Sequence, residues 1–199
     1  MRRSRGREAA AATLALMAGL TGCSSPDIAP VDSGVPTSSA LPSRSLPPVT
    51  GKWAGLKDKC PQLGGEAAGK LFVSGPGEPT DEWRQLPEVT EADCHWGAEG
   101  GNSVDAKVEI WSKQAAADAG WQIIANTMTE PLAVGQQGSL SETPFTAIVA
   151  YARTDNVLVT VKIYPPGATN KPVTQQVLDK VRPYAKGITE DVLDDLVAA

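Results

Sequence analysis

Alternation of apolar and polar residues predicts strands in the middle of the chain. Between residues 104 and 110 the apolar side chains fall at every second position, which is the pattern of a half-buried strand: Val104, Ala106, Val108 and Ile110. Segments 145–153 and 157–164 are rich in apolar and β-branched residues, and segment 91–98 is a further candidate strand. Thr154-Asp155-Asn156 predicts a hairpin turn between the last two strands.

Apolar residues three or four positions apart predict helices elsewhere. We expect one helix at 53–59, one from Pro61, and one at 113–128 that Ser112 opens. A fourth helix is expected to begin near Pro172 and to be kinked or ended by Pro183, and Thr189 is expected to cap a last helix. The inward residues of these helices are expected to be Leu63, Ala67, Leu71, Ala117, Trp121, Ile124, Met128, Val173, Val177, Leu178, Val181, Val192, Leu193, Leu196 and Val197.

The order of these elements predicts the fold class. Hairpin turns join neighbouring strands in antiparallel pairs, and the amphipathic helices need a surface to cover. We therefore predict an α+β fold, with a single twisted, mainly antiparallel sheet covered by helices. Residues 53–199 have the length of one domain.

The first 22 residues have a different composition and resemble a targeting signal. Four arginines at positions 2, 3, 5 and 7 precede an apolar run at 9–20. This run is shorter than the roughly 20 apolar residues of a membrane span, so a cleaved secretory signal is expected. Leu20-Thr21-Gly22-Cys23 resembles the lipobox of bacterial lipoproteins. The resemblance implies cleavage before Cys23, diacylation of its thiol, and attachment to the outer face of the cell membrane. Whether export follows the general or the twin-arginine route stays open.

Composition then separates a tether from the domain. Residues 24–52 hold many Pro and Ser residues and no aromatic residue, which predicts a flexible spacer between Cys23 and the domain. Loss of residues 1–22 removes four Arg and one Glu, which moves the formal net charge from −5 to −8. An acidic protein is a poor partner for nucleic acid or an anionic lipid surface, so membrane attachment is expected to depend on the lipid.

Cys60 and Cys94 remain once Cys23 carries lipid. Outside the cytoplasm two such cysteines usually pair, and these two are 34 positions apart. We therefore expect a disulfide. The alternative is a reactive or metal-binding thiol pair beside His95.

No catalytic residue, metal site or cofactor is predicted. The segment 64–71 resembles a phosphate-binding loop, but Leu71 stands where Ser or Thr would hold magnesium, so no nucleotide is expected. His95, the only histidine, is expected to be a surface or hydrogen-bonded residue, because Cys94 beside it on a strand faces the other way. The acidic residues of the last helix are expected to form a solvated face: Glu190, Asp191, Asp194 and Asp195.

Five tryptophans are many for a domain of this size: Trp53, Trp83, Trp96, Trp111 and Trp121. Most are expected in the core. Trp83, in a segment predicted to be irregular, and Trp111, opposite the apolar face of its strand, are the candidates for contact with a sugar or lipid ligand.

Two cysteine motifs carry a family resemblance. Asp58-Lys59-Cys60 and Cys94-His95-Trp96, together with the lipobox, the tether and Val134-Gly135, resemble actinobacterial secreted lipoproteins that carry a domain of unknown function. Lys59 replaces the proline expected there, and Gly138 stands where that family often has alanine. The resemblance implies a PsbP-like α+β fold with paired cysteines, and no established catalytic residues.

The sequence thus predicts an extracytoplasmic, lipid-anchored protein of non-enzymatic binding or scaffolding function, with an envelope protein or a cell-wall ligand as its partner. A sugar- or lipid-binding module that uses exposed tryptophans and an unrecognised hydrolase are the alternatives.

Overall fold

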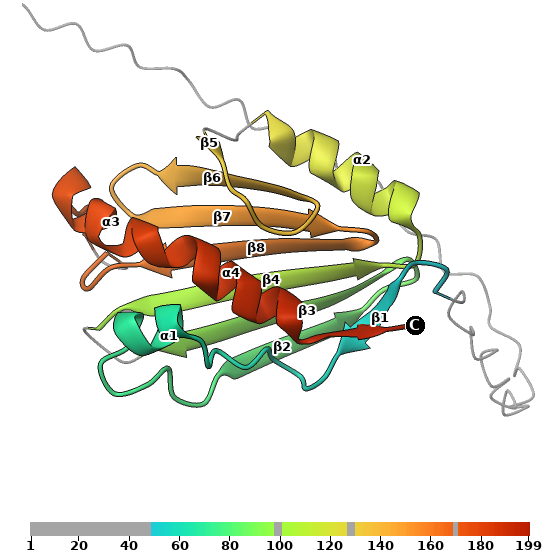
Figure 1. Cartoon of the computed structure of the whole chain (residues 1–199), viewed down its shortest axis with the longest axis horizontal. Coiled ribbons are helices and arrows are strands. Elements are labelled where there is room, and N and C mark those ends of the chain that lie inside the picture. The colour runs from blue at the N-terminus through green and yellow to red at the C-terminus, as the bar shows by residue number, and fades with distance from the viewer. Residues whose placement is uncertain (1–48, 98–100, 127–129, 169–170) are drawn as a thin grey trace, which may run out of the picture. The chain divides into compact units, whose positions relative to one another are not determined.

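A seven-stranded antiparallel sheet forms the centre of the protein (Figure 1). The computed structural model describes residues 49–97, 101–126, 130–168 and 171–199. The signal, Cys23 and all but the last four residues of the expected tether lie outside this part. In spatial order the strands are β2 (Thr80–Gln85), β3 (Val89–Gly97), β4 (Ser103–Trp111), β8 (Val157–Tyr164), β7 (Ala147–Thr154), β6 (Gln137–Thr143) and β5 (Glu130–Pro131).

One face of this sheet carries the main core. The apolar residues of β3, β4, β8 and β7 alternate onto this face, where Trp96, Val104 and Ile163 are 2% exposed or less. The helices α1 (Glu66–Leu71), α3 (Gln175–Val181) and α4 (Ala185–Asp194) lie on this side (Figure 1). They contribute buried apolar side chains, including Leu178 and Ile188, to the same core.

The opposite face is covered only in part. Helix α2 (Gln114–Ala125) packs Ala117 and Trp121 against Leu158 of β8 in a second, smaller core. Arg153 of β7 is almost completely buried and forms an ion pair with Asp118 of α2, which holds this helix to the sheet.

A second sheet of two strands joins the ends of the described chain. β1 (Trp53–Leu56) pairs antiparallel with β9 (Leu196–Ala198). The fully buried side-chain amide of Asn156, in the β7–β8 turn, accepts a hydrogen bond from Trp53 N (2.9 Å) and donates to Trp53 O (2.9 Å) and Trp111 O (2.7 Å). Asp155 accepts a bond from Lys52 N at 3.1 Å. The central hairpin therefore holds β1 in place.

The segment between β1 and α1 has no regular structure, yet several bonds fix it. The disulfide Cys60–Cys94 ties it to β3. The carboxylate of Asp195 accepts hydrogen bonds from Gln62 N and from Lys57 Nζ, and that of Asp191 accepts one from Gly65 N at 3.1 Å. Hydrogen bonds to Asp191 and Asp195, at the end of α4, therefore fix the segment between β1 and α1.

The structure confirms much of the sequence prediction. The mainly antiparallel sheet, the disulfide, the strand at 104–110, the candidate strand at 91–98, seen as β3, and the hairpin turn before Val157 are present. Helix α2 buries Ala117 and Trp121 as expected, although Met128 lies outside the described residues. Pro183 lies in a single 3-10 turn, η1 (Arg182–Tyr184), which separates α3 from α4. The expected cover of helices is only partial.

Several predictions were wrong. Segment 53–59 contains β1 instead of a helix, because its backbone pairs with β9, and α1 begins at Glu66. There are two sheets and not one. Thr189 caps no helix: it lies within α4, where its hydroxyl donates to Ala185 O at 2.7 Å. Leu196 and Val197 belong to β9.

The acidic residues near the end of the chain do not form a purely solvated face. Asp195 is 7% exposed and Asp191 is half-buried, because both hold the backbone of segment 57–65. Burial and the neighbouring carboxylates raise the pKa of Asp191, although the hydrogen bond from Gly65 opposes this.

The Asn156 side chain gives the first testable prediction. Asn156→Ala leaves Trp53 N–H and two carbonyls without their partner, so we expect the free energy of unfolding in urea to fall by about 2–4 kcal/mol. Asn156→Asp places a carboxylate against two carbonyl oxygens and should cost at least as much. Gln122→Ala, on the exposed side of α2, is the matched control. A loss at Asn156 no larger than that of the control contradicts this role.

A second prediction concerns the Cys60–Cys94 disulfide. Both side chains are buried, and the bond closes a loop of 34 residues. Replacing both cysteines by Ser should lower the free energy of unfolding by about 3–4 kcal/mol, because the unfolded chain gains entropy. Urea unfolding of parent and variant without reductant measures this difference, and equal midpoints would disprove it.

Candidate functional site

The uncovered part of the second sheet face carries rows of polar side chains. Residues that are paired across strands point to the same face, so the register fixes these rows. In one row Thr80, His95, Asp105 and Lys162 follow one another from β2 to β8. In the next row the order is Glu82, Asp93, Lys107 and Thr160, followed by Tyr151 of β7. We call these two rows, without Tyr151, the open face.

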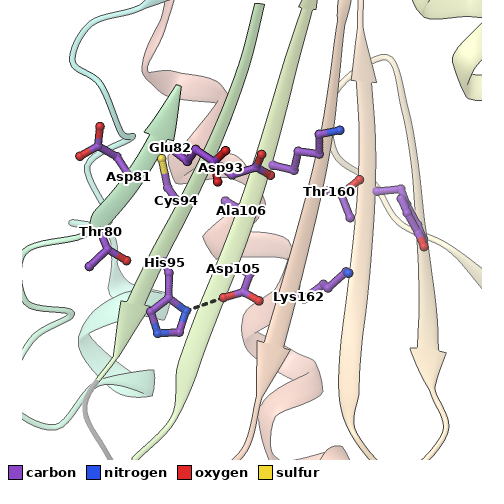
Figure 2. A pocket seen from close by; sticks show the side chains of 12 residues that line it. Thr80, Asp81, Glu82, Asp93, Cys94, His95, Asp105, Ala106, Thr160 and Lys162 are labelled. Atoms are coloured by element: carbon purple, nitrogen blue, oxygen red, sulfur yellow. Dashed lines mark hydrogen bonds and ion pairs between the residues drawn. The ribbon is translucent and has the colours of Figure 1, made fainter. Parts of the chain in front are cut away.

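The open face is hollowed. A cavity of about 650 Å³ lies over it, and its lining includes all eight residues of the open face and Tyr151 (Figure 2). Tyr151 packs against the smaller core beneath α2, so this helix ends the open face on that side.

His95 and Asp105 form the shortest contact of the cavity. The Nδ1 of His95 lies 2.5 Å from Oδ1 of Asp105 (Figure 2). An ionised carboxylate only accepts hydrogen bonds, so Nδ1 carries the proton and donates it, which leaves Nε2 as the second ring nitrogen. Both side chains are about half exposed. The pair therefore fixes the orientation of the imidazole ring.

Tyr164 of β8 shares the Asp105 carboxylate. Burial, the charge of Asp105 and a side-chain hydrogen bond to it raise the pKa of Tyr164 to about 12. The tyrosine therefore stays neutral and keeps its proton beside Asp105. The Asp105 carboxylate therefore interacts with both His95 and Tyr164.

The lysines of the open face differ in their partners. Lys107 bonds Glu91 at 3.0 Å and Glu109 at 3.2 Å. Burial alone would lower its pKa, but these two carboxylates raise it. Lys162 lies directly opposite Asp105 in the register, yet the Asp105 carboxylate turns to His95. Within the described ranges no carboxylate forms an ion pair with Lys162, which leaves its ammonium group available to a ligand.

In the described ranges no hydroxyl or thiol group is hydrogen-bonded to His95. Thr80 is opposite His95 in the register, but in the described part of the chain no hydrogen bond joins them. Cys94 faces the core, as the alternation predicted, and is bonded to Cys60. Among the described residues no group of three or more His, Cys, Asp and Glu side chains is placed to hold a metal ion.

The tryptophans proposed from the sequence and the phosphate-loop-like segment do not line the cavity. Trp83 lies on β2, not in an irregular segment; it is 38% exposed, and its indole N–H donates to Lys59 O at 2.6 Å. Trp111 is partly buried beneath α2. Lys70 of the phosphate-loop-like segment lies on α1 and forms an ion pair with Glu66 at 2.5 Å.

His95 was expected to be a surface or hydrogen-bonded residue, and its bond to Asp105 confirms this. The other residues of the open face were missed because no short motif contains them. The alternation of β3 and β4 was their only signal.

Comparison with known proteins gives no assignment. No profile of a known protein family, no curated protein and no solved structure matches this chain. In the described part, none of the helices combines the length and apolar character needed to cross a bilayer.

Asp105 gives the third prediction. Asp105→Asn removes the negative charge beside Tyr164, so the pKa of Tyr164 should fall from about 12 toward its usual value of 10.0 and stay above it, because burial remains. Ultraviolet titration of the phenolate in a Tyr151→Phe, Tyr184→Phe background measures it. Asp93→Asn, one row away, is the matched control.

The raised pKa of Tyr164 also determines how the stability of the fold depends on pH. The folded pKa of Tyr164 is raised, so its contribution to stability is fully present below pH 10.0 and is lost as the pH rises toward about 12. Asp105→Asn should narrow the pH range over which this contribution to stability is lost. An unchanged titration of Tyr164 in Asp105→Asn would contradict the contact.

Proposed function

We propose that this chain is a cell-envelope lipoprotein, anchored to the outer face of the membrane by lipid on Cys23, whose domain is a non-enzymatic binding or scaffolding module. The lipobox-like Leu20-Thr21-Gly22-Cys23 supports the anchor. The disulfide supports an oxidising compartment outside the cytoplasm. An α+β fold fits such a module, because α1, α3 and α4 cover one face of the sheet while α2 covers only part of the other, which leaves the open face to a partner.

The cavity over the open face carries the binding part of the proposal. Its polar groups lie on packed strands, and ion pairs and hydrogen bonds hold several of them in place. These side chains therefore lose little conformational entropy when a partner binds. Lys107 is fixed by two carboxylates and Asp105 by His95. Lys162 remains available.

A sugar ligand is the second candidate, and one observation favours it. The cavity brings together carboxylates, hydroxyl groups and the aromatic ring of Tyr151, which are the groups that bind the hydroxyls and apolar faces of sugars. We therefore propose Tyr151, instead of Trp83 or Trp111, as the aromatic contact of such a ligand.

The fourth prediction tests the lipid anchor in cells. The full chain should be found in the membrane fraction, with a mass that includes lipid, whereas Cys23→Ala should be released without lipid. A Cys23→Ala protein that stays in the membrane fraction with unchanged mass would disprove the anchor.

The binding surface is tested separately by photo-crosslinking. A photoreactive amino acid in place of Thr160, in the cavity, should give a specific adduct that Lys162→Glu weakens. The same amino acid in place of Lys180, exposed on α3, is the matched control. Equal adducts from both positions, or none from position 160, would argue against the open face as the binding surface.

A further inference from the structure

The edge strand β2 offers backbone groups without a partner strand. β2 pairs with β3 over six consecutive residues, and in the described part of the chain no strand lies on its other side. All six of its residues are exposed. The other edge of the sheet is different, because β5 has two residues and one of them is Pro131. Proline and short length are known protections of an edge, and β2 has neither.

The hydrogen-bond pattern shows which groups of β2 point outward. Leu86 N donates to Val89 O at 2.9 Å next to the turn between β2 and β3. Hydrogen-bonded and non-hydrogen-bonded pairs alternate along an antiparallel ladder, so Arg84 and Glu82 bond to β3. The backbone N–H and C=O groups of Asp81, Trp83 and Gln85 therefore point to the open edge.

The side chains of β2 match a second copy of the same strand. We propose that two copies of this chain form a symmetric dimer in which their β2 strands pair antiparallel about Trp83. In this register Trp83 faces the partner's Trp83, and Asp81 faces the partner's Gln85. These pairs exchange up to about six backbone hydrogen bonds. Glu82 of each copy lies opposite Arg84 of the other, so the symmetry produces this pair twice. Both are non-hydrogen-bonded pairs, in which the side chains lie closer together.

Charge selects this register over its neighbours. Backbone groups that point to the open edge can bond only to groups that point to the open edge of the partner. The nearest other symmetric registers that satisfy this condition are centred on Glu82 or on Arg84. The first places Glu82 against the partner's Glu82, and the second places Arg84 against the partner's Arg84, so each sets like charges opposite each other. Only the register centred on Trp83 pairs opposite charges at both positions. In it the partner's Glu82 joins the ion pairs that Arg84 already forms in its own chain with Asp93 at 2.8 Å, Glu82 at 3.5 Å and Glu91 at 3.6 Å.

The dimer would join two open faces. Glu82 and Thr80 of β2 belong to the open face and lie near the proposed axis. Pairing of the β2 edges makes one continuous sheet from two, with a cavity on each side of the axis. The dimer itself does not depend on the proposed function, because it follows from the backbone and charges of β2.

Charge reversal tests the dimer, and this is the fifth prediction. In sedimentation equilibrium of the full chain in detergent, we expect a concentration-dependent dimer. Glu82→Arg and Arg84→Glu each set like charges across the axis twice and should weaken the dimer about tenfold or more. A mixture of the two variants restores both opposite-charge pairs, so it should form a heterodimer. Glu78→Arg makes the same charge change outside β2 and should leave the dimer unchanged.

Single cysteines test the register and do not rely on charge. Trp83→Cys should form a disulfide-linked dimer under mild oxidation, because its Cα atoms would lie about 5.5 Å apart. Glu82→Cys and Arg84→Cys should form less, and the parent chain gives the background from Cys23. Circular dichroism checks that each variant is folded. A parent that stays monomeric, a Glu82→Arg dimer as tight as the parent's, or stronger crosslinking at position 82 or 84 than at position 83 would overturn the proposal.

Discussion

The burial of one face of the central sheet is the constraint on which the rest of the structure depends. In β3, β4 and β8 every second side chain enters the core, and Val104, Val108 and Val161 are fully buried there. A slip of one residue in any of these strands would turn its apolar set to solvent and its charges into the core, which fixes the register. The same register aligns His95, Asp105 and Lys162 on the other face. The polar rows are therefore a consequence of the core packing.

The elements with strong local signals could be predicted from the sequence. The alternation in β4, the apolar runs of β7 and β8 and the helical spacing of Ala117 and Trp121 each lie within one segment, so no distant partner is needed to recognise them. The disulfide could be predicted because only two cysteines remain after Cys23, whatever the fold that brings them together.

The remaining elements depend on partners far away in the sequence. β1 is short, and within the described residues its one partner strand is β9, far away in the sequence, so the local pattern of residues 53–59 does not predict a strand. β2 is exposed at all six positions, so no apolar alternation marks it. The cavity is built from five strands, and its residues become neighbours only through the register. From the sequence Asp195 is expected to be a solvated surface residue. Its burial depends on the hydrogen bond from the backbone N–H of Gln62, which is far away in the sequence.

The contacts of Asn156 also determine how the domain would carry mechanical load. Ala199 N donates to Lys52 O at 2.9 Å, so the first and last described strands meet beside the β7–β8 turn. A pull on the chain at residue 49 reaches the hydrogen bonds from Thr50 to Ser112 O first, and then the three bonds of Asn156 and the ladder between β1 and β9. Because Asn156 lies at the end of two central strands, tension would enter the middle of the sheet and would not peel its edge. A pull from that side would therefore leave the open face and the β2 edge unloaded.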